Sequence, residues 1–260
     1  MGISHSTARW LAPLSFVVDF AAQQYGIYGS SPTMKDVHDA NMSFFSPQAY
    51  FIGAFFFPQQ LFQLAWLWKL HNSDPEEEDT KEMVDFAPFY AAGNFAIAAW
   101  MIFWCNNDLR TSNYFVIANS LMQLFYVFGR LRPMRLDSTR SVLTHVNAKT
   151  FAGIGVLDLL HNTAAGYFVH GRPSGAVKAL TAVGFGALGA SSDWIFGGCL
   201  VYDLVALAVG QSQYGDAGWS KMLGAYAVGT AGIVAARNYF RPPYIKSSGY
   251  EPVRGTSRST

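Results

Sequence analysis

The sequence contains little charge, and what charge it has is unevenly distributed. Charged residues make up 13% of its 260 residues, about half of the roughly 25% typical of soluble globular chains. Of these 35 residues, 21 lie in three segments, 69–85, 130–149 and 237–260. The remaining 199 residues therefore carry only 14 charges, while 51% of the chain is hydrophobic. This composition excludes an ordinary soluble domain and predicts a membrane protein with several spans.

Cysteine and net charge exclude two further classes of protein. The two cysteines, Cys105 and Cys199, both lie in apolar runs, so we expect neither a disulfide framework nor a paired redox or metal motif. A net charge of +1 offers no basic surface for nucleic acid. The first eight residues carry no cluster of positive charge, and Asp19 interrupts the first apolar stretch. We therefore expect internal spans, and not a cleavable signal peptide, to direct insertion.

The chain contains several long runs without charged residues. A helix that crosses a bilayer needs roughly 20 apolar residues. Three such runs predict spans near 48–68, 87–106 and 111–129. Five weaker candidates contain an acidic residue or many small residues, and they lie near 10–28, 150–170, 176–191, 194–211 and 218–238.

The positions of the basic residues decide between seven and eight spans. Loops rich in Lys and Arg tend to stay in the cytoplasm, and the segments 130–149 and 237–260 each hold five such residues. An even number of crossings must then separate them, which requires the weak segment 176–191 to cross as well. With eight spans, 13 basic residues lie on the cytoplasmic side and five outside. We predict an all-α transmembrane bundle over residues 1–240, with both termini cytoplasmic and a disordered tail over 241–260.

No recognisable catalytic motif is present. The sequence has no phosphate-binding glycine loop, no His-Glu-x-x-His, no Gly-x-Ser-x-Gly and no Cys/His array. We therefore expect no enzyme activity, no cofactor and no metal site. A haem site is also disfavoured, because His145 and His170 lie at the ends of a predicted helix and His5, His38 and His71 fall in tail or loops.

Ionisable residues inside the predicted spans are the most specific signal. A charge near mid-membrane costs roughly 2.5–3.5 kcal/mol on insertion scales, so each needs a physical reason. Asp158, His161 and Asn162 share one helix face, on which Asp158 and His161 are close enough to bond directly, and Asp203 lies near the middle of a later span. Asp19 is similarly placed in the first span. We interpret Asp158, His161, Asn162 and Asp203 as a ligand or proton site; a packing network and a metal site are the alternatives.

Part of the chain resembles a known family. The segments that carry the resemblance are Phe45-Ser46-Pro47, Phe51-Ile52-Gly53 and Leu61-Phe62, followed by Asn94, Trp100, Phe103 and Trp104 in the next span. Over about residues 44–129 they are similar to the tryptophan-rich sensory proteins, which include the translocator proteins. The whole chain resembles a group of fungal multi-span membrane proteins.

The resemblance implies a pocket for a hydrophobic or amphipathic small molecule, lined by Asn94, Trp100, Phe103 and Trp104. The chain departs from the family at Phe57-Pro58, where the family tends to place Trp, and in its eight predicted helices against about five. The alternative is that Trp66, Trp68 and Trp104 are anchors at the membrane interface.

Two classes of function follow. In the first, a protein embedded in the lipid bilayer binds or transports a small hydrophobic molecule through a site inside the bundle. In the second, a structural or assembly protein docks other subunits, or further copies of itself, through small-residue helix faces and the acidic segment 74–79.

Overall fold

The computed structural model describes residues 3–240 and the backbone of 244–245. In this part the chain is all-α, with nine α-helices and one two-residue strand pair. The helices are α1 (His5–Gln24), α2 (Met34–Ala40), α3 (Ala49–His71), α4 (Glu78–Cys105), α5 (Leu109–Gly129), α6 (Thr139–Tyr167), α7 (Gly175–Ser191), α8 (Trp194–Tyr214) and α9 (Ala217–Phe240). A π-helical turn, η1 (Tyr25–Gly29), extends α1, and β1 (Met134–Arg135) pairs in parallel with β2 (Tyr244–Ile245).

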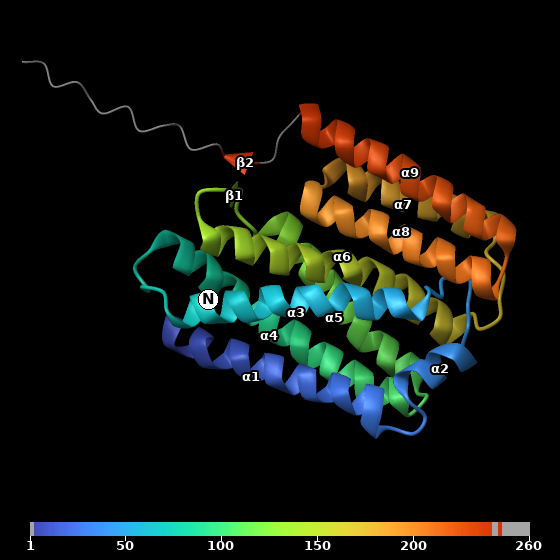
Figure 1. Ribbon diagram of the computed structural model, residues 1–260, viewed down its shortest axis with the longest axis horizontal. Helices are drawn as coiled ribbons and strands as arrows, with labels where there is room; N and C mark the ends of the chain where they lie inside the picture. The colour runs from blue at the N-terminus through green and yellow to red at the C-terminus, as the bar shows by residue number, and fades with distance from the viewer. Residues whose placement is uncertain (1–2, 241–243, 246–260) are drawn as a thin grey trace, which may run out of the picture.

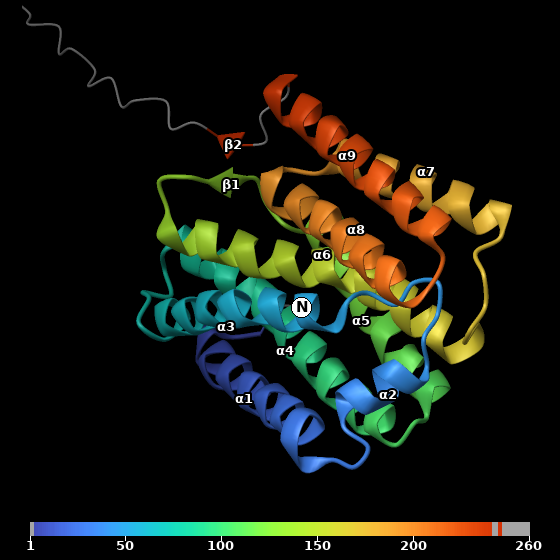
Figure 2. The ribbon, with the colours of Figure 1, turned by 45° about the vertical axis from the view of Figure 1, so that its right-hand side comes forward.

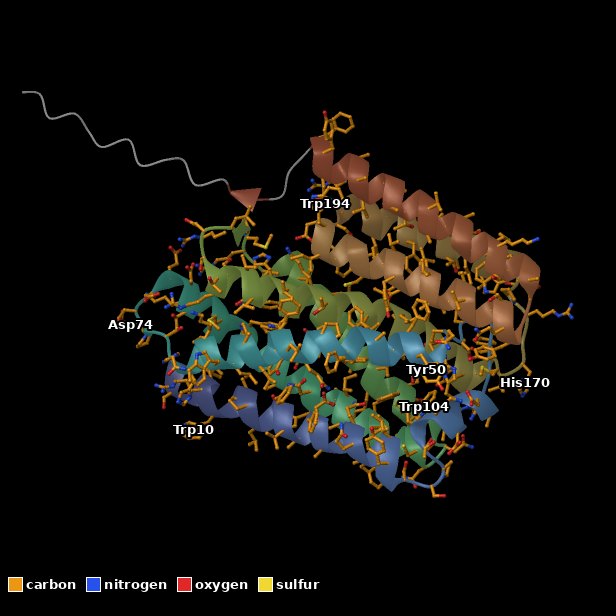
Figure 3. The ribbon with its side chains drawn as sticks, in the orientation of Figure 1. Trp10, Tyr50, Asp74, Trp104, His170 and Trp194 are labelled. Carbon is orange, nitrogen blue, oxygen red and sulfur yellow. The ribbon has the colours of Figure 1, made fainter. Side chains whose placement is uncertain are left out.

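The eight long helices run alternately between the two ends of one bundle (Figure 1). Helix α6 contacts α3, α4, α5 and α8, so it lies at the centre. Helix α1 packs on α4 at one side, and α7 and α9 pack beyond α8 at the other (Figure 2). Asp74 lies at one end of the bundle, and Tyr50 and His170 lie at the opposite end (Figure 3).

Local capping residues set where several helices begin. The first free backbone N–H groups of a helix need acceptors, which short polar side chains supply. Ser4, Asp108, Ser138, Ser174 and Asp193 each accept a backbone hydrogen bond at the start of α1, α5, α6, α7 and α8. Short loops between these caps force consecutive helices to lie antiparallel.

The eight long helices coincide with the eight ranges predicted as spans, but two begin much earlier. Helix α4 begins at Glu78 and α6 at Thr139, whereas the predicted ranges began at 87 and 150. Apolar runs mark where a chain is hydrophobic, but a helix continues through charged turns until it reaches its cap. The predicted disordered tail lies outside the described residues, except for β2.

Hydropathy alone identifies fewer spans than the prediction. By length and apolarity, α4 and α8 are the two helices of the described chain that are able to cross a membrane, and each is about half buried. Helix α7 is apolar but short, at 17 residues. The fold is therefore established as all-α, and the eight crossings remain a prediction.

Candidate functional site

A cavity of about 120 Å³ lies inside the bundle, lined by residues of α1, η1, α2, α3, α4, α5 and α6. Most of its wall is apolar, with the aromatic residues Phe16, Phe20, Phe56, Trp100 and Phe151. The polar wall consists of two carboxylates and five amides, from Asp19, Asp158, Gln23, Gln24, Gln60, Gln63 and Asn119. The cavity therefore combines an apolar surface with a concentrated set of oxygen atoms.

The two carboxylates reach the cavity from different helices. Asp158 is on α6, is half-buried, and has no hydrogen-bond donor to its side chain among the described residues. Asp19 is on α1 and accepts one bond from Gln23 Nε2 to Oδ1, 3.1 Å long. Asp158 is one of the predicted site residues, whereas its proximity to Asp19 across the cavity is not evident from the sequence. A carboxylate that the protein leaves unpaired is available to a ligand.

Asn162 joins the predicted polar site to the predicted aromatic pocket. Trp100 Nε1 donates a 2.7 Å hydrogen bond to Asn162 Oδ1, and Asn162 Nδ2 donates to the backbone oxygen of Asp158 at 2.9 Å. The ring of Trp104 lies 5.5 Å from that of Trp100. The two sites that the sequence suggested separately are thus contiguous.

Trp104 is not an interface anchor, which was the alternative reading of this residue. It is 1% exposed, and its Nε1 donates to the backbone oxygen of Met34. The other two members of the predicted aromatic pocket do not line the cavity. Asn94 Nδ2 donates to Ser15 Oγ, and Phe103 stacks on Phe115 with ring centres 5.4 Å apart. Of the four predicted pocket residues, only Trp100 faces the cavity.

His161 bonds to a residue that the sequence reasoning placed in a loop. His161 Nε2 and His38 Nδ1 lie 3.2 Å apart, so one of these nitrogens donates and the other accepts. Both rings are buried, and among the described residues no hydrogen bond joins His161 to Asp158. The expected direct contact between Asp158 and His161 is therefore replaced by a pair of histidines.

The short helix α2 brings His38 to this position. Its start is a capping box, in which Thr33 Oγ1 accepts from the Asp36 N–H and the Asp36 carboxylate accepts from the Thr33 N–H. That pattern is visible in the sequence and would have predicted a helix containing His38. Burial lowers the pKa of His38 below its ordinary value, because burial disfavours the charged ring.

Asp203 lies apart from the cavity. It is on α8, it is 0% exposed, and neither carboxylate oxygen has a hydrogen-bond partner among the described side chains and backbone. The residues that line the cavity do not include any from α8. Asp158 still acts on Asp203 by charge repulsion when both are ionised. The predicted cluster is therefore divided between a cavity wall and a separate buried position.

A second, polar pocket of about 510 Å³ opens at the end of the bundle that contains His170. Ser43, Phe44, His170, Arg172, Tyr214 and Asp216 are among its lining residues. The Tyr214 ring also lies 6.4 Å from that of His38. The histidine pair therefore lies between this pocket and the region of Asn162 and Trp100.

The acidic and basic loops pair with each other at the opposite end. Arg135 bonds Asp79 at 2.9 Å, Arg132 approaches Glu78 at 3.3 Å, and Arg140 pairs with Glu77. These contacts tie the start of α4 to the segment that leads into α6. The acidic segment thus has partners within its own chain.

These features define the class of the molecule: an all-helical bundle with a mostly apolar interior cavity that contains two carboxylates. The described residues contain no group of three or more His, Cys, Asp or Glu side chains that would hold a metal ion. Comparisons with protein-family models, with curated proteins and with solved structures gave no match. The resemblance over residues 44–129 stays a prediction.

Proposed function

We propose that this chain is an eight-span membrane protein that binds and transports a small molecule through its interior cavity. The observation that carries the proposal is that Asp19 and Asp158, from two different helices, both line one cavity inside the bundle. Binding sites are usually concave and mostly apolar, with a few convergent polar groups, and this cavity fits that description.

An inverted distribution of polarity supports the membrane part of the proposal. On α3, Gln59 and Gln63 face inward and are 3% exposed, whereas Phe57 and Trp68 face outward and are about 70% exposed. Outward apolar side chains recur on the other long helices, including Leu14, Ile102, Leu121, Leu180 and Val228. Such surfaces are costly in water and favourable in lipid.

The same distribution explains why hydropathy selects only two helices. Inward-facing amides lower the mean hydropathy of α3, and Asn113, Asn119 and Gln123 do the same for α5. A hydropathy average counts every side chain equally, whereas lipid meets only the outer face. Burial of these amides inside the bundle removes most of their cost.

The positions of the charged loops support the proposed orientation. The acidic segment near Asp74 and the basic segment 130–140 lie at one end of the bundle, as a shared cytoplasmic side requires. Tags at the two termini should both be inaccessible in intact cells and become accessible on permeabilisation. Tags on opposite sides would overturn the eight-span arrangement.

Binding in the cavity is tested by blocking it without disturbing the packing. An added Cβ at Gly53, which lines the cavity, would meet no other atom within 4 Å, and the same holds for Gly198 on α8 outside the cavity. With the full chain in lipid nanodiscs, we expect benzyl alcohol to raise the Tm of the wild type and of Gly198→Phe more than that of Gly53→Phe. Equal stabilisation of all three would mean that the probe acts on the lipid, and the proposal would fail.

The second class of function, docking of other subunits, is favoured by one surface. On α9 the exposed residues Ala225, Gly229, Gly232 and Ala236 form a stripe of small side chains. The acidic segment adds little to this case, because three of its five carboxylates pair with Arg132, Arg135 and Arg140.

A further inference from the structure

We infer that the ligand of the interior cavity is a small organic cation: a protonated amine attached to an aromatic or aliphatic body. This inference rests on the proposed function, since it names the ligand class of the same cavity. The residues that line the cavity include two carboxylates and no Lys, Arg or His. These carboxylates would neutralise the charge of a positively charged ligand.

The Asp158 carboxylate is the principal group for such a ligand. It receives no hydrogen bond from the described residues, whereas Asp19 already accepts one from Gln23. An ammonium group supplies three donors, and charge-assisted hydrogen bonds to a carboxylate are the strong ones. A neutral or anionic ligand would leave Asp158 without compensation.

Trp100 suits the apolar body of the same ligand. The single donor of its indole ring, Nε1, is used by Asn162, so what Trp100 offers to the cavity is the ring itself. An aromatic ring attracts a nearby cation through its quadrupole as well as packing on apolar groups. Phe16, Phe20, Phe56 and Phe151 extend this aromatic wall.

Asn119 adds a polar contact that the protein does not use. It is 3% exposed and lines the cavity, and its Oδ1 accepts from Gln123 Nε2. Its Nδ2 has no acceptor among the described residues. An amine that carries a hydroxyl or ether oxygen would satisfy this donor as well as Asp158.

The cavity volume limits the size of the ligand. An engineered cavity of about 150 Å³ is known to hold one benzene molecule. At about 120 Å³, the present cavity is smaller than that, so it suits a compact amine with a short branched chain, and a single ring is the upper limit of what it would hold. Benzylamine, benzyl alcohol and benzoate form a matched series with the same ring and a positive, neutral or negative substituent.

The test measures the Tm of the full-length protein in nanodiscs as a function of each probe. We expect benzylamine to bind about tenfold or more tightly than benzyl alcohol, because the ammonium group adds a charge–charge attraction to its hydrogen bond with the carboxylate, and we expect benzoate not to bind because its charge is repelled. Asp158→Asn and Asp19→Asn should each reduce the preference for the amine. Asp137→Asn, a surface carboxylate outside the cavity, should retain it.

The outcomes distinguish failure of the cation inference from failure of the proposed binding in the cavity. Equal binding of the amine and the alcohol would overturn the cation inference and leave cavity binding in place. Failure of both probes would overturn both. Stabilisation by sodium chloride or calcium chloride alone, lost in Asp158→Asn, would assign the site to an inorganic cation and overturn the amine. The comparison of probes on the wild type keeps the test decisive even if a variant does not fold.

Transport is measured separately, as uptake of radiolabelled benzylamine into proteoliposomes. We expect uptake by the wild type and by Asp137→Asn, and loss of uptake in Asp158→Asn. Binding without uptake would overturn the transport part of the proposed function while leaving the amine site intact.

Discussion

Two regions of the bundle differ in how tightly their interior is packed. Around the cavity, the walls leave open space, and the side chain of Asp158 has no partner. Where residues 43–48 pack against α8 and α9, an added Cβ at Gly210 would lie 2.4 Å from the Ser46 oxygen. Trp219 is fully buried there and donates to the Phe44 oxygen at 2.7 Å. The contrast indicates that the packed junction holds the fold, whereas the cavity is available for binding.

The largest expected effect is at the packed junction. Trp219→Ala removes a fully buried ring and the hydrogen bond to Phe44, and we expect it to lower the free energy of unfolding by about 3–5 kcal/mol. Chemical unfolding in detergent micelles measures this change. Trp10→Ala is the control, because Trp10 is 73% exposed. Equal losses for the two variants would remove the distinction between junction and surface.

Gly210 provides the next test of the same junction. Gly210→Ala forces a methyl group against the backbone of Ser46 and Pro47, and we expect a loss of about 1–3 kcal/mol in the free energy of unfolding. The matched control is Gly198→Ala on the same helix, where a Cβ meets no atom within 4 Å. If Gly210→Ala leaves the free energy of unfolding unchanged, residues 43–48 move aside without loss of stability.

The histidine pair lies between the two regions and gives a pH-dependent effect. Because the folded pKa of His38 is lowered, its contribution to stability is complete above its ordinary pKa of about 6.5. Below that pH the contribution falls by at most about 1.4 kcal/mol per pH unit, until the folded pKa is reached. His161, Tyr214, Lys35 and Asp39 are the titratable groups that act on this ring.

The measurement is the free energy of unfolding between pH 7 and pH 5, for the wild type and for His38→Gln. We expect a shallower slope for the variant, since glutamine does not titrate. Identical slopes would show that His38 does not carry the pH dependence.

A smaller effect is expected at the end that is remote from both regions. Arg140→Gln removes the pairing with Glu77 and the 2.7 Å hydrogen bond from Arg140 Nε to Ser73 Oγ, and ion pairs near the surface contribute about 0.2–1 kcal/mol. Added salt should reduce the difference from the wild type, because it screens the pair. Arg172→Gln is the control, since Arg172 forms no ion pair with another described residue.

The smallest effect on stability is expected at the cavity itself. Asp158→Asn breaks no side-chain hydrogen bond and replaces a carboxyl group by an amide of similar size, so we expect a change close to zero. Calorimetric or chemical unfolding measures it beside the binding assay. A large loss of stability would show that Asp158 is structural, which was the alternative reading of this residue.

Much of the helical framework is predictable, because apolar runs and caps are local features of the chain. Asp158 stands out for the same reason, as a charge in an apolar segment. What is not local is the partner of each group: His161 meets His38 from 123 residues away, and Phe45-Ser46-Pro47 packs under Gly210. The resemblance motif therefore has a packing role here, which no spacing along the chain indicates.

The pairing of charged loops at one end has a mechanical consequence. Arg132, Arg135 and Arg140 fix the start of α4 against the segment that leads into α6, so a change in the angle between these helices turns about that end. With 28 residues, α4 is about 42 Å long, and a tilt of about 5° would move its far end by roughly 4 Å. Trp100 lies in that far part of α4. Because Trp100 lines the cavity, such a tilt would displace this part of the cavity wall while the paired charges keep the other end of α4 in place.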